Sequence, residues 1–369
     1  MQLLDLGVVV LNWNGIADTV ACLESIYGDS SVPAYVVVVD NGSTDASVPG
    51  VLAWLNAQPN YCVAPLPSEE VTTGVREFRL RRLPEGRAAT SDDRTATPEE
   101  PACVFAVIEN ERNLGFAAGN NVGIRYLLER SVEYVLLLNN DTVVAPDALA
   151  MLAMAMNAER PVQCMIPQIR YWSEPTRIWN CGGAWTWFGS PRYYHAEASI
   201  DVLEGQAPFT VDFVTGCALI IRSSWLAEQG GLSERFFHGE EDVEFSWRMR
   251  AAAPRSMMCW PSAVVYHKVG SSVSRMAQLS RLPMVYCHYL NRLIFLRTVW
   301  GRGPRWQVRR LVTVAYLAWQ LNRRYRFSFR DALSVAGDLL SDSSQHDGVS
   351  AELFMWIMRE KFGSVPATP

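Results

Sequence analysis

Two aspartates stand directly after valine- and leucine-rich runs and are the first candidates for chemistry. Asp40 ends the run 35–39, and Asp141 follows the run 134–138 after two asparagines. A carboxylate at the end of a buried strand is costly unless it is paired or binds a cation. Asp141 could bind a divalent cation that holds a diphosphate, since hard oxygen ligands suit magnesium or manganese, and Asp40 could accept hydrogen bonds from a nucleobase or ribose. Taken singly, each aspartate could equally be a helix cap or a turn residue.

The segment 236–248 is a second candidate. Glu240, Glu241, Asp242 and Glu244 place four carboxylates within five residues, and aromatic side chains bracket them. On a helix that starts here, Asp242 in an apolar rim could act as a general base. Alone, the same cluster could also be an acidic helix N-terminus that interacts favourably with the helix dipole.

A third candidate is His267, which follows the apolar run 263–265. A single histidine is more often structural than a metal ligand. An aspartate and a histidine together can nevertheless hold a transition metal such as manganese. We therefore take Asp141 and His267 as a candidate ligand pair for Mg²⁺ or Mn²⁺.

The elements that must position these residues alternate along the first 160 residues. The expected strands are 6–11, 35–39, 103–108 and 134–138. The expected helices are 18–27, one from about 45 to 55, 117–129, and one from Pro146 in its first turn to Met156. This alternation predicts a parallel α/β sheet, and the carboxyl ends of its strands form the edge where such sheets bind ligands.

Residues 64–101 interrupt this alternation, because they are rich in Arg, Glu, Pro and Thr. We interpret them as an insertion before the third strand, and the composition favours disorder over a hairpin. After residue 160, tryptophans and tyrosines among glycines and prolines predict short strands and loops that shape a pocket. We expect one α/β domain over 1–275, with this insertion, and a helical, basic C-terminal region over 276–369.

Composition excludes several classes. The chain has 369 residues, a net charge of -5 and eight cysteines without a C-x-x-C pair, so a zinc ribbon or thioredoxin-type site is not expected. Free buried cysteines in a reducing compartment are expected instead. There is no signal-peptide pattern and no run of 18 apolar residues, which predicts a cytoplasmic protein.

Residues 283–330 contain ten arginines and no Asp, Glu or Lys, and aromatic residues stand between them. Basic amphipathic helices with aromatics bind anionic membrane surfaces, so we expect this region to contact a membrane. An oligomer interface is an alternative. A nucleic-acid patch is less favoured, because nothing elsewhere in the chain indicates base readout.

Together, these segments resemble the family 2 glycosyltransferases, which are inverting enzymes with the GT-A fold. The motifs that carry the resemblance stand in order at 8–15 (VVVLNWNG), 37–45 (VVVDNGSTD), 109–124 (ENERNLGFAAGNNVGI), 136–144 (LLLNNDTVV), 213–223 (FVTGCALIIRS) and 236–250 (FFHGEEDVEFSWRMR). Residues 109–124 resemble the rhamnosyltransferase-like branch. The resemblance covers about residues 5–300 apart from the insertion, and the ordered set is more specific than any one motif.

The resemblance implies an inverting transfer of a sugar from a nucleotide-diphosphate sugar, with dTDP-rhamnose as the favoured donor. The implied acceptor is a hydroxyl of a glycan or lipid-linked glycan in cell-surface polysaccharide synthesis. Asp242 is implied to be the general base with Glu241 beside it, and Asp141 and His267 the metal ligands. The implied donor-binding residues are Asn12, Asn14, Asp40, Asn41, Asn113, Asn120 and Asn140, and the implied acceptor-binding residues are Thr215, Gly216 and Trp247. Asn139 stands where the family's metal motif usually has its first acid.

Three other functions fit the sequence less well. A nucleotidyltransferase would carry a glycine-rich basic signature after its first strand, and LNWNGIADT has no Lys or Arg. A non-catalytic nucleotide-sugar-binding protein would not need the Glu241–Asp242 pair. A dinucleotide oxidoreductase would carry G-x-G-x-x-G after the first strand, which is absent.

Overall fold

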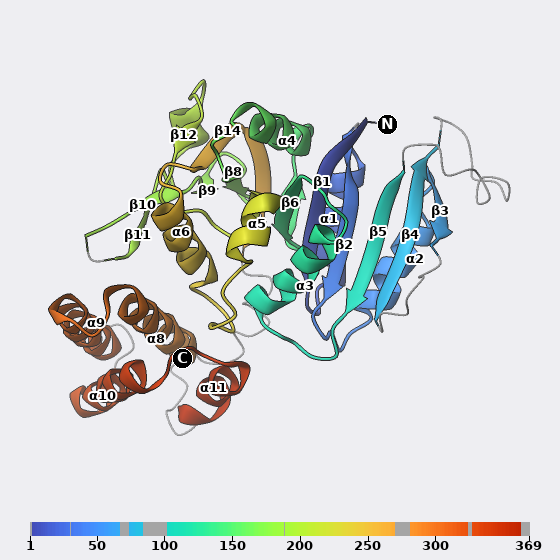
Figure 1. Ribbon diagram of the computed structural model, residues 1–369. Coiled ribbons are helices and arrows are strands. Elements are labelled where there is room, and N and C mark those ends of the chain that lie inside the picture. Colours follow the sequence, from blue (N-terminus) through green and yellow to red (C-terminus); the bar gives the residue numbers. More distant parts are fainter. Residues whose placement is uncertain are drawn as a thin grey trace.

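The computed structural model describes residues 2–29, 31–66, 74–83, 102–187, 189–269, 281–323 and 327–362. Over these ranges, helices cover both faces of a mixed, largely parallel sheet, and a group of helices from the C-terminal region lies beside it (Figure 1). The main strand order is β12-β14-β8-β13-β6-β1-β2-β5-β4-β3. This is the α/β architecture that the sequence predicts, with a helical C-terminal region.

The parallel half of the sheet contains the four strands that the sequence predicts. They are β1 (Gln2–Asn12), β2 (Ser31–Asp40), β5 (Cys103–Glu109) and β6 (Tyr134–Asn139). Neighbouring strands pair in parallel, β1 with both β2 and β6, and β2 with β5. Their valine and leucine runs are continuous because helices bury both faces of these strands.

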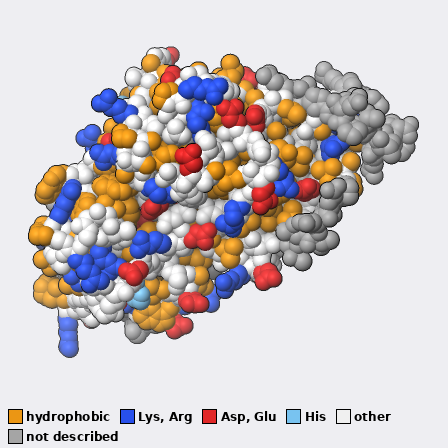
Figure 2. All heavy atoms as spheres, viewed as in Figure 1, with side chains coloured by type: hydrophobic (Ala, Val, Ile, Leu, Met, Phe, Trp, Pro, Cys, Tyr) orange, Lys and Arg blue, Asp and Glu red, His pale blue; other side chains and the backbone are white. Residues whose placement is uncertain are grey.

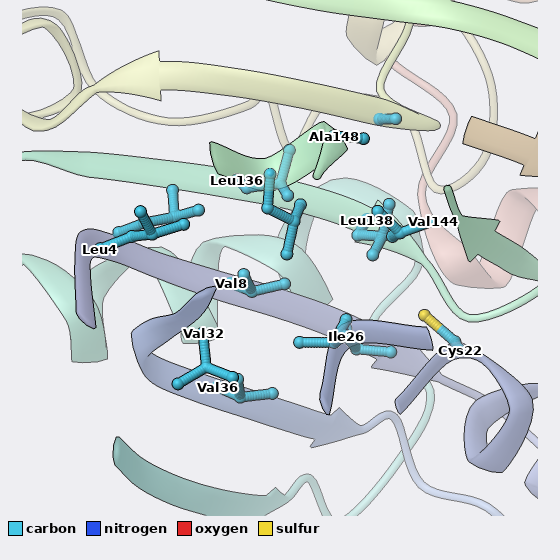
Figure 3. Packing of buried hydrophobic residues seen from close by; sticks show 14 of the residues in the cluster. Leu4, Val8, Cys22, Ile26, Val32, Val36, Leu136, Leu138, Val144 and Ala148 are labelled. Carbon is cyan, nitrogen blue, oxygen red and sulfur yellow. The ribbon is translucent and has the colours of Figure 1, made fainter. Parts of the chain in front are cut away.

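Two helical layers cover the sheet. One face carries α1 (Ile16–Tyr27), α2 (Ser47–Asn56) and α4 (Ala148–Ala158). Figure 3 shows this core, in which Val8, Val36 and Leu136 of the sheet pack near Cys22 and Ile26 of α1. The other face carries α3 (Phe116–Leu128), α5 (Ser223–Gln229) and α6 (Glu241–Ala252). The expectation that Pro146 lies in the first turn of α4 was wrong, because the helix starts two residues later, after Asp147 in a left-handed conformation.

The second half of the sheet is mixed. β13 (Ala218–Arg222) runs antiparallel between β6 and β8 (Cys164–Tyr171), and β14 (Met257–His267) runs parallel to β8. Short strands complete this half: β7 (Thr142–Val144), β9 (Ile178–Asn180), β12 (Phe209–Thr210) and the separate pair β10 (Gly183–Trp185) with β11 (Pro191–Tyr193). Apart from β7, these are the short strands and loops that the sequence predicts after residue 160.

The insertion is ordered in part, which corrects the expectation of disorder. β4 (Val75–Arg82) pairs antiparallel with β5 and with β3 (Tyr61–Pro65), so a hairpin extends the sheet at this edge. Leu80 is fully buried, and Glu77 is bound by Tyr126 of α3 and by Arg130, which follows the end of that helix. Residues 67–73 and 84–101 lie outside the described residues.

The C-terminal helices are α8 (Arg281–Trp300), α9 (Pro304–Arg323), α10 (Phe329–Gln345) and α11 (Ala351–Trp356), which continues as a π-helical turn over Ile357–Lys361. They enclose their own apolar core, and Phe213, Phe236 and Val243 of the α/β part are members of it. The two parts of the chain are therefore packed together through the segment that contains the predicted general base.

This core corrects the sequence interpretation of residues 283–330. Tyr286, Phe295 and Trp306 are buried in it, so these aromatics cannot reach a membrane. Arg292 and Arg297 are buried as well, and each forms an ion pair with an acidic residue, Glu240 and Asp347 respectively. Acidic residues outside 283–330 thus neutralise part of the charge, which the composition of that stretch alone did not reveal.

Two further expectations can be compared with the structure. All eight cysteines are free and buried. None of the helices in the described ranges is long and apolar enough to cross a membrane.

Candidate active site

Asp141 and His267 meet because β14 returns to the end of β6. β7 follows Asp141 directly and pairs antiparallel with β14, with His267 opposite Thr142. This register places His267 Nε2 at 3.2 Å from Asp141 Oδ1, and the amide of Lys268 donates to the Asp141 carbonyl at 2.9 Å. Both side chains are buried. Two residues 126 positions apart in the sequence therefore form one polar pair.

The surroundings of this pair suit a cation. The ring of Trp179 lies edge-on to His267 at 4.4 Å, and His267 Nδ1 is buried without a hydrogen-bond partner among the described residues. Burial favours the neutral imidazole, but Cys217 and the bond to Asp141 outweigh it and raise the pKa of His267 to about 10. Within the described ranges no third acidic, histidine or cysteine side chain completes an all-protein metal cluster. Mg²⁺ and Mn²⁺ commonly use one or two protein ligands plus substrate phosphates, so Asp141 and a deprotonated His267, whose proton the metal would displace, fit such a site.

A network of buried polar side chains lies at the carboxyl ends of β1 and β2. Asn12 donates to Asp40 at 2.7 Å, and the second oxygen of Asp40 accepts from the amide of Ser43 at 3.0 Å. Asn12 in turn accepts from Thr19 and Asn140. The strand ends are therefore tied together across β1, β2 and β6, where the sequence predicts the donor site.

Two loops follow this network. The left-handed residue Asn14 accepts from the amide of Thr44 at 2.7 Å. Asn41 donates to Asn113 at 2.9 Å and to the carbonyl of Gly115, which places the 110–115 loop beside the end of β2. Asn120 differs from these residues, because its amide donates to the Phe116 carbonyl within α3.

Asp242 lies in the first turn of α6. The amides of Gly216 and Val243 donate to its carboxylate, which is half-buried. Burial raises the pKa of Asp242 to about 6, and burial together with the charge of Asp242 raises the pKa of Glu241 to about 8. The charge of Asp242 disfavours ionisation of Glu241, so the two carboxyls do not ionise independently. Asp242 lines the cavity described below and is the carboxyl of this pair placed to accept a proton from a bound molecule.

A cavity of about 370 Å³ opens at Asp242. Its walls combine aromatic and polar side chains from β8 to β11 and the loop before β13: Tyr171, Trp179, Asn180, Tyr193, Ala196, Glu197, Phe213 and Thr215. Gly216 lies next to this wall, and a Cβ there would contact Phe116 at 3.1 Å. The cavity therefore joins Trp179, which touches His267, to the carboxylate of Asp242.

Trp247, which the resemblance implies to contact the acceptor, does not line this cavity. Its ring packs against Trp185 at 5.1 Å and against Phe295 of α8 at 6.1 Å. Five residues separate it from Asp242, which on a helix turns the side chain by about 140° to another face. Trp247 belongs to the contact between α6 and the C-terminal helices.

The electrostatics of Cys217 involve both the candidate base and the candidate ligand pair. Its thiol pKa is raised by burial first, and the charges of Asp141 and Asp242 raise it further. The charge of the nearby His267 acts in the opposite direction and lowers this pKa. The carboxylate at the end of β6 and the carboxylate at the start of α6 therefore both lie within electrostatic reach of one side chain.

The sequence of this chain is similar to those of known proteins. The family model described as Glycosyl transferase family 2 matches residues 90–225. The pre-mycofactocin glycosyltransferase of Mycobacterium tuberculosis is 27% identical over 214 residues, which are 55% of this chain and 41% of that protein. Both matches support a family 2 glycosyltransferase. The chain spans less than half the length of the curated relatives that it matches.

Among solved structures, the fold is similar to the crystal structure of GalNAc-T7 with UDP, GalNAc and Mn²⁺. The TM-score is 0.53 and the identity 15%, over 100% of this chain and 59% of that chain. At this identity the likeness shows the fold alone, which is the GT-A fold that the motifs predict.

Sequence reasoning missed several residues around Asp242. Tyr193, Glu197 and Tyr171 line the cavity, and no motif marks them. The tryptophans and tyrosines after residue 160 indicated a pocket but not which of them face it. Arg292 was assigned to a membrane surface, whereas its side chain reaches the turn before α6. Nothing in the sequence distinguishes Arg292 from the other arginines of this stretch, so that contact could not be predicted.

Proposed function

We propose that this chain is an inverting glycosyltransferase that moves a sugar from a nucleotide-diphosphate sugar to an acceptor hydroxyl. One observation carries the proposal: a single cavity is lined by the Asp242 carboxylate and by Trp179, and Trp179 contacts the His267 that pairs with Asp141 at a strand end. Such a transfer needs a base on the acceptor side and charge stabilisation on the leaving-group side. The match of residues 90–225 to the model of glycosyl transferase family 2 supports this assignment.

In the proposed transfer reaction, each group of residues has a separate role. Asp242 accepts the proton of the acceptor hydroxyl as its oxygen forms a bond to the anomeric carbon. The bond from that carbon to the diphosphate oxygen breaks on the opposite side, so the configuration inverts. Asp141 and His267 would hold Mg²⁺ or Mn²⁺, which as a Lewis acid stabilises the charge on the leaving diphosphate. The network at Asn12 and Asp40 holds the strand ends where the nucleotide binds.

The donor in this proposal is dTDP-rhamnose, from the resemblance of residues 109–124 to the rhamnosyltransferase-like branch. The test is a thermal-shift screen of nucleotide sugars with Mn²⁺, followed by a transfer assay that measures release of the nucleoside diphosphate. A donor at one hundred times its dissociation constant stabilises the folded state by about 2.7 kcal/mol. Stabilisation by another nucleotide sugar would reject rhamnose, and no stabilisation by any of them would reject the transferase.

The acceptor in this proposal is a sugar unit of a glycan or lipid-linked glycan. The cavity at Asp242 presents the rings of Trp179 and Tyr193 with the polar groups of Asn180, Glu197 and Thr215. Aromatic faces bind the apolar faces of sugar rings while a few polar groups orient the hydroxyls. Substitution of Tyr193 by alanine should raise the KM for the acceptor and leave donor binding unchanged.

A surface for an anionic membrane is proposed on α9 in place of the whole 283–330 stretch. Five large apolar side chains on this helix are about half-exposed, on one side of it: Val308, Leu311, Val312, Tyr316 and Trp319. Arg305, Arg309, Arg310 and Arg323 flank them, and α9 contains no acidic residue. Figure 2 shows basic and hydrophobic side chains side by side over the C-terminal helices. Such a helix fits the headgroup region of an anionic bilayer, at the inner face of the cell membrane, where lipid-linked acceptors lie.

Co-sedimentation with liposomes tests this surface. We expect binding to anionic but not neutral vesicles, weaker at high salt, and lost in the double variant Leu311→Glu, Trp319→Glu. The control is Met154→Glu, which changes an exposed apolar residue on α4, outside the C-terminal helices. Equal binding to both lipids, or none, would reject the membrane. A dimer that dissociates in the double variant would assign the surface to a second copy of the chain.

A further inference from the structure

The turn before α6 is held in an unusual backbone conformation. Gly239 and Glu240 both have positive φ angles, 87° and 74°, and Glu240 is the residue from which α6 starts. A side chain such as glutamate rarely adopts this conformation unless its surroundings enforce it. Because Glu241 and Asp242 follow at once, whatever holds the turn also sets the direction of the proposed base.

Two consecutive residues of α8 hold this turn. Arg292 Nε lies 2.5 Å from Glu240 Oε2, and both side chains are less than a tenth exposed. Arg292 also donates to the Gly189 carbonyl at 3.3 Å. Asn291 donates to the His238 carbonyl at 2.8 Å. Helix α8, about fifty residues away in sequence, therefore binds both the backbone and a side chain of the turn.

The rest of the C-terminal region supports the same segment. The amide of Phe237 donates to the Val349 carbonyl at 2.8 Å, and the amide of Val349 donates to the Arg235 carbonyl at 2.8 Å. The ring of Phe237 lies 5.0 Å from Phe354 of α11. On the opposite side, the Phe237 carbonyl accepts from the amide of Phe116 at the start of α3. The segment 235–240 is thus clamped between the donor-side loop and the C-terminal helices.

A buried ion pair is weak evidence for stability, because removing two charges from water offsets much of their attraction. The charges around Asp242 give this pair another role. Glu240 and Glu241 are acidic neighbours, Tyr193 of β11 and the thiol of Cys217 face the group from the sheet side, and Arg292 faces it from α8. After burial, Glu240 raises the pKa of Asp242 most strongly and Arg292 lowers it.

We infer that Arg292 is a positioning residue for the general base: by pairing with Glu240 it holds the turn that presents Asp242 to the cavity and balances the carboxylate charge beside it. This inference rests on the proposed function for the role of Asp242. The contact between Arg292 and Glu240 does not depend on the proposed function. It also assigns the C-terminal helices a part in the active site, because α8 supplies the cation.

The test measures the pKa of Asp242 directly, by ¹³C NMR of the aspartate carboxyl with Asp242→Asn for assignment, and the acid limb of kcat in parallel. Arg292→Met leaves the Glu240 charge beside Asp242 unbalanced, so we expect the pKa and the acid limb to rise by about one unit. Glu240→Gln removes that charge and should shift both downward. Arg292→Lys keeps the charge and should stay near the wild type. If Arg292→Met does not fold, the Glu240→Gln and Arg292→Lys variants still decide the sign.

Arg297→Met is the matched control. Arg297 is also a buried arginine of α8, but it binds Asp347 and the carbonyls of Ser343 and His346. Its loss should lower the melting temperature without moving the Asp242 pKa. An unchanged pKa and acid limb in Arg292→Met and Glu240→Gln would overturn the inference. A shifted pKa in a protein that transfers no sugar would instead reject the proposed function and leave the Arg292–Asp242 coupling standing.

Discussion

Replacing Asp242 with asparagine removes the proposed base and nearly preserves its shape. General base catalysis contributes about 10²–10⁴-fold, so kcat should fall by that factor, which is about 3–5 kcal/mol of transition-state free energy. Donor binding should remain, because the nucleotide network lies at Asn12 and Asp40. Loss of turnover with retained Mn²⁺-dependent stabilisation by the donor would assign Asp242 to the acceptor side.

The same change should make the protein more stable. Burial raises the pKa of Asp242 from 3.8 to about 6, so the folded state holds the proton more tightly than the unfolded state. The stability that this preference contributes is complete below pH 3.8 and is lost as pH rises through about 6. A difference of about two units corresponds to about 3 kcal/mol. Because the side chain is partly open to the cavity and two amides donate to it, about 1–2 kcal/mol is a better expectation at pH 7.5.

The assay pairs single-turnover kinetics with thermal unfolding of the same preparations. The control is Glu244→Gln, which alters a carboxylate on the same helix that pairs with Arg248 at 3.2 Å and lies away from the cavity. We expect Asp242→Asn to melt a few degrees higher than the wild type and the control to show near-normal turnover. Wild-type turnover in Asp242→Asn would exclude it as the base. A lower melting temperature would refute the argument from the buried charge.

Three further predictions follow from the geometry. Turnover should fall as pH drops through about 6, because Asp242 must be ionised to accept a proton; a pH–kcat profile flat down to pH 5 would contradict this. Asp141→Ala and His267→Ala should each weaken Mn²⁺-dependent donor binding by at least tenfold in titration calorimetry, and full activity in excess EDTA would defeat the metal assignment. Leu80→Ala should destabilise the protein by about 2–4 kcal/mol in denaturant unfolding, since β4 buries this side chain; a change below 0.5 kcal/mol would mean that the hairpin adds little to the fold.

The sequence alone determined the parallel half of the sheet, and the reason is local. Continuous valine and leucine runs bounded by Asn, Asp and Gly are typical of the central strands of a parallel sheet, which are buried on both faces. Their ends then locate Asp40 and Asp141 at one edge without further information. The eight buried cysteines followed from similar apolar contexts. The ordered motifs added the family, which no single spacing could establish.

Tertiary structure alone decided which distant groups meet. Asp141 and His267 become neighbours through the antiparallel register of β7 and β14, and strand order is a property of the whole sheet. The rotation of about 140° between Asp242 and Trp247 around α6 directs one side chain to the cavity and the other to α8.

Arg292 is the clearest case. The residue type of Arg292 and its neighbours along the chain predict a basic surface. In the folded protein, Arg292 is instead buried in an ion pair with Glu240, which is distant in sequence. The charge of a residue is read from sequence, but its partner is set by packing, because a buried ion pair forms only where two distant segments are brought into contact.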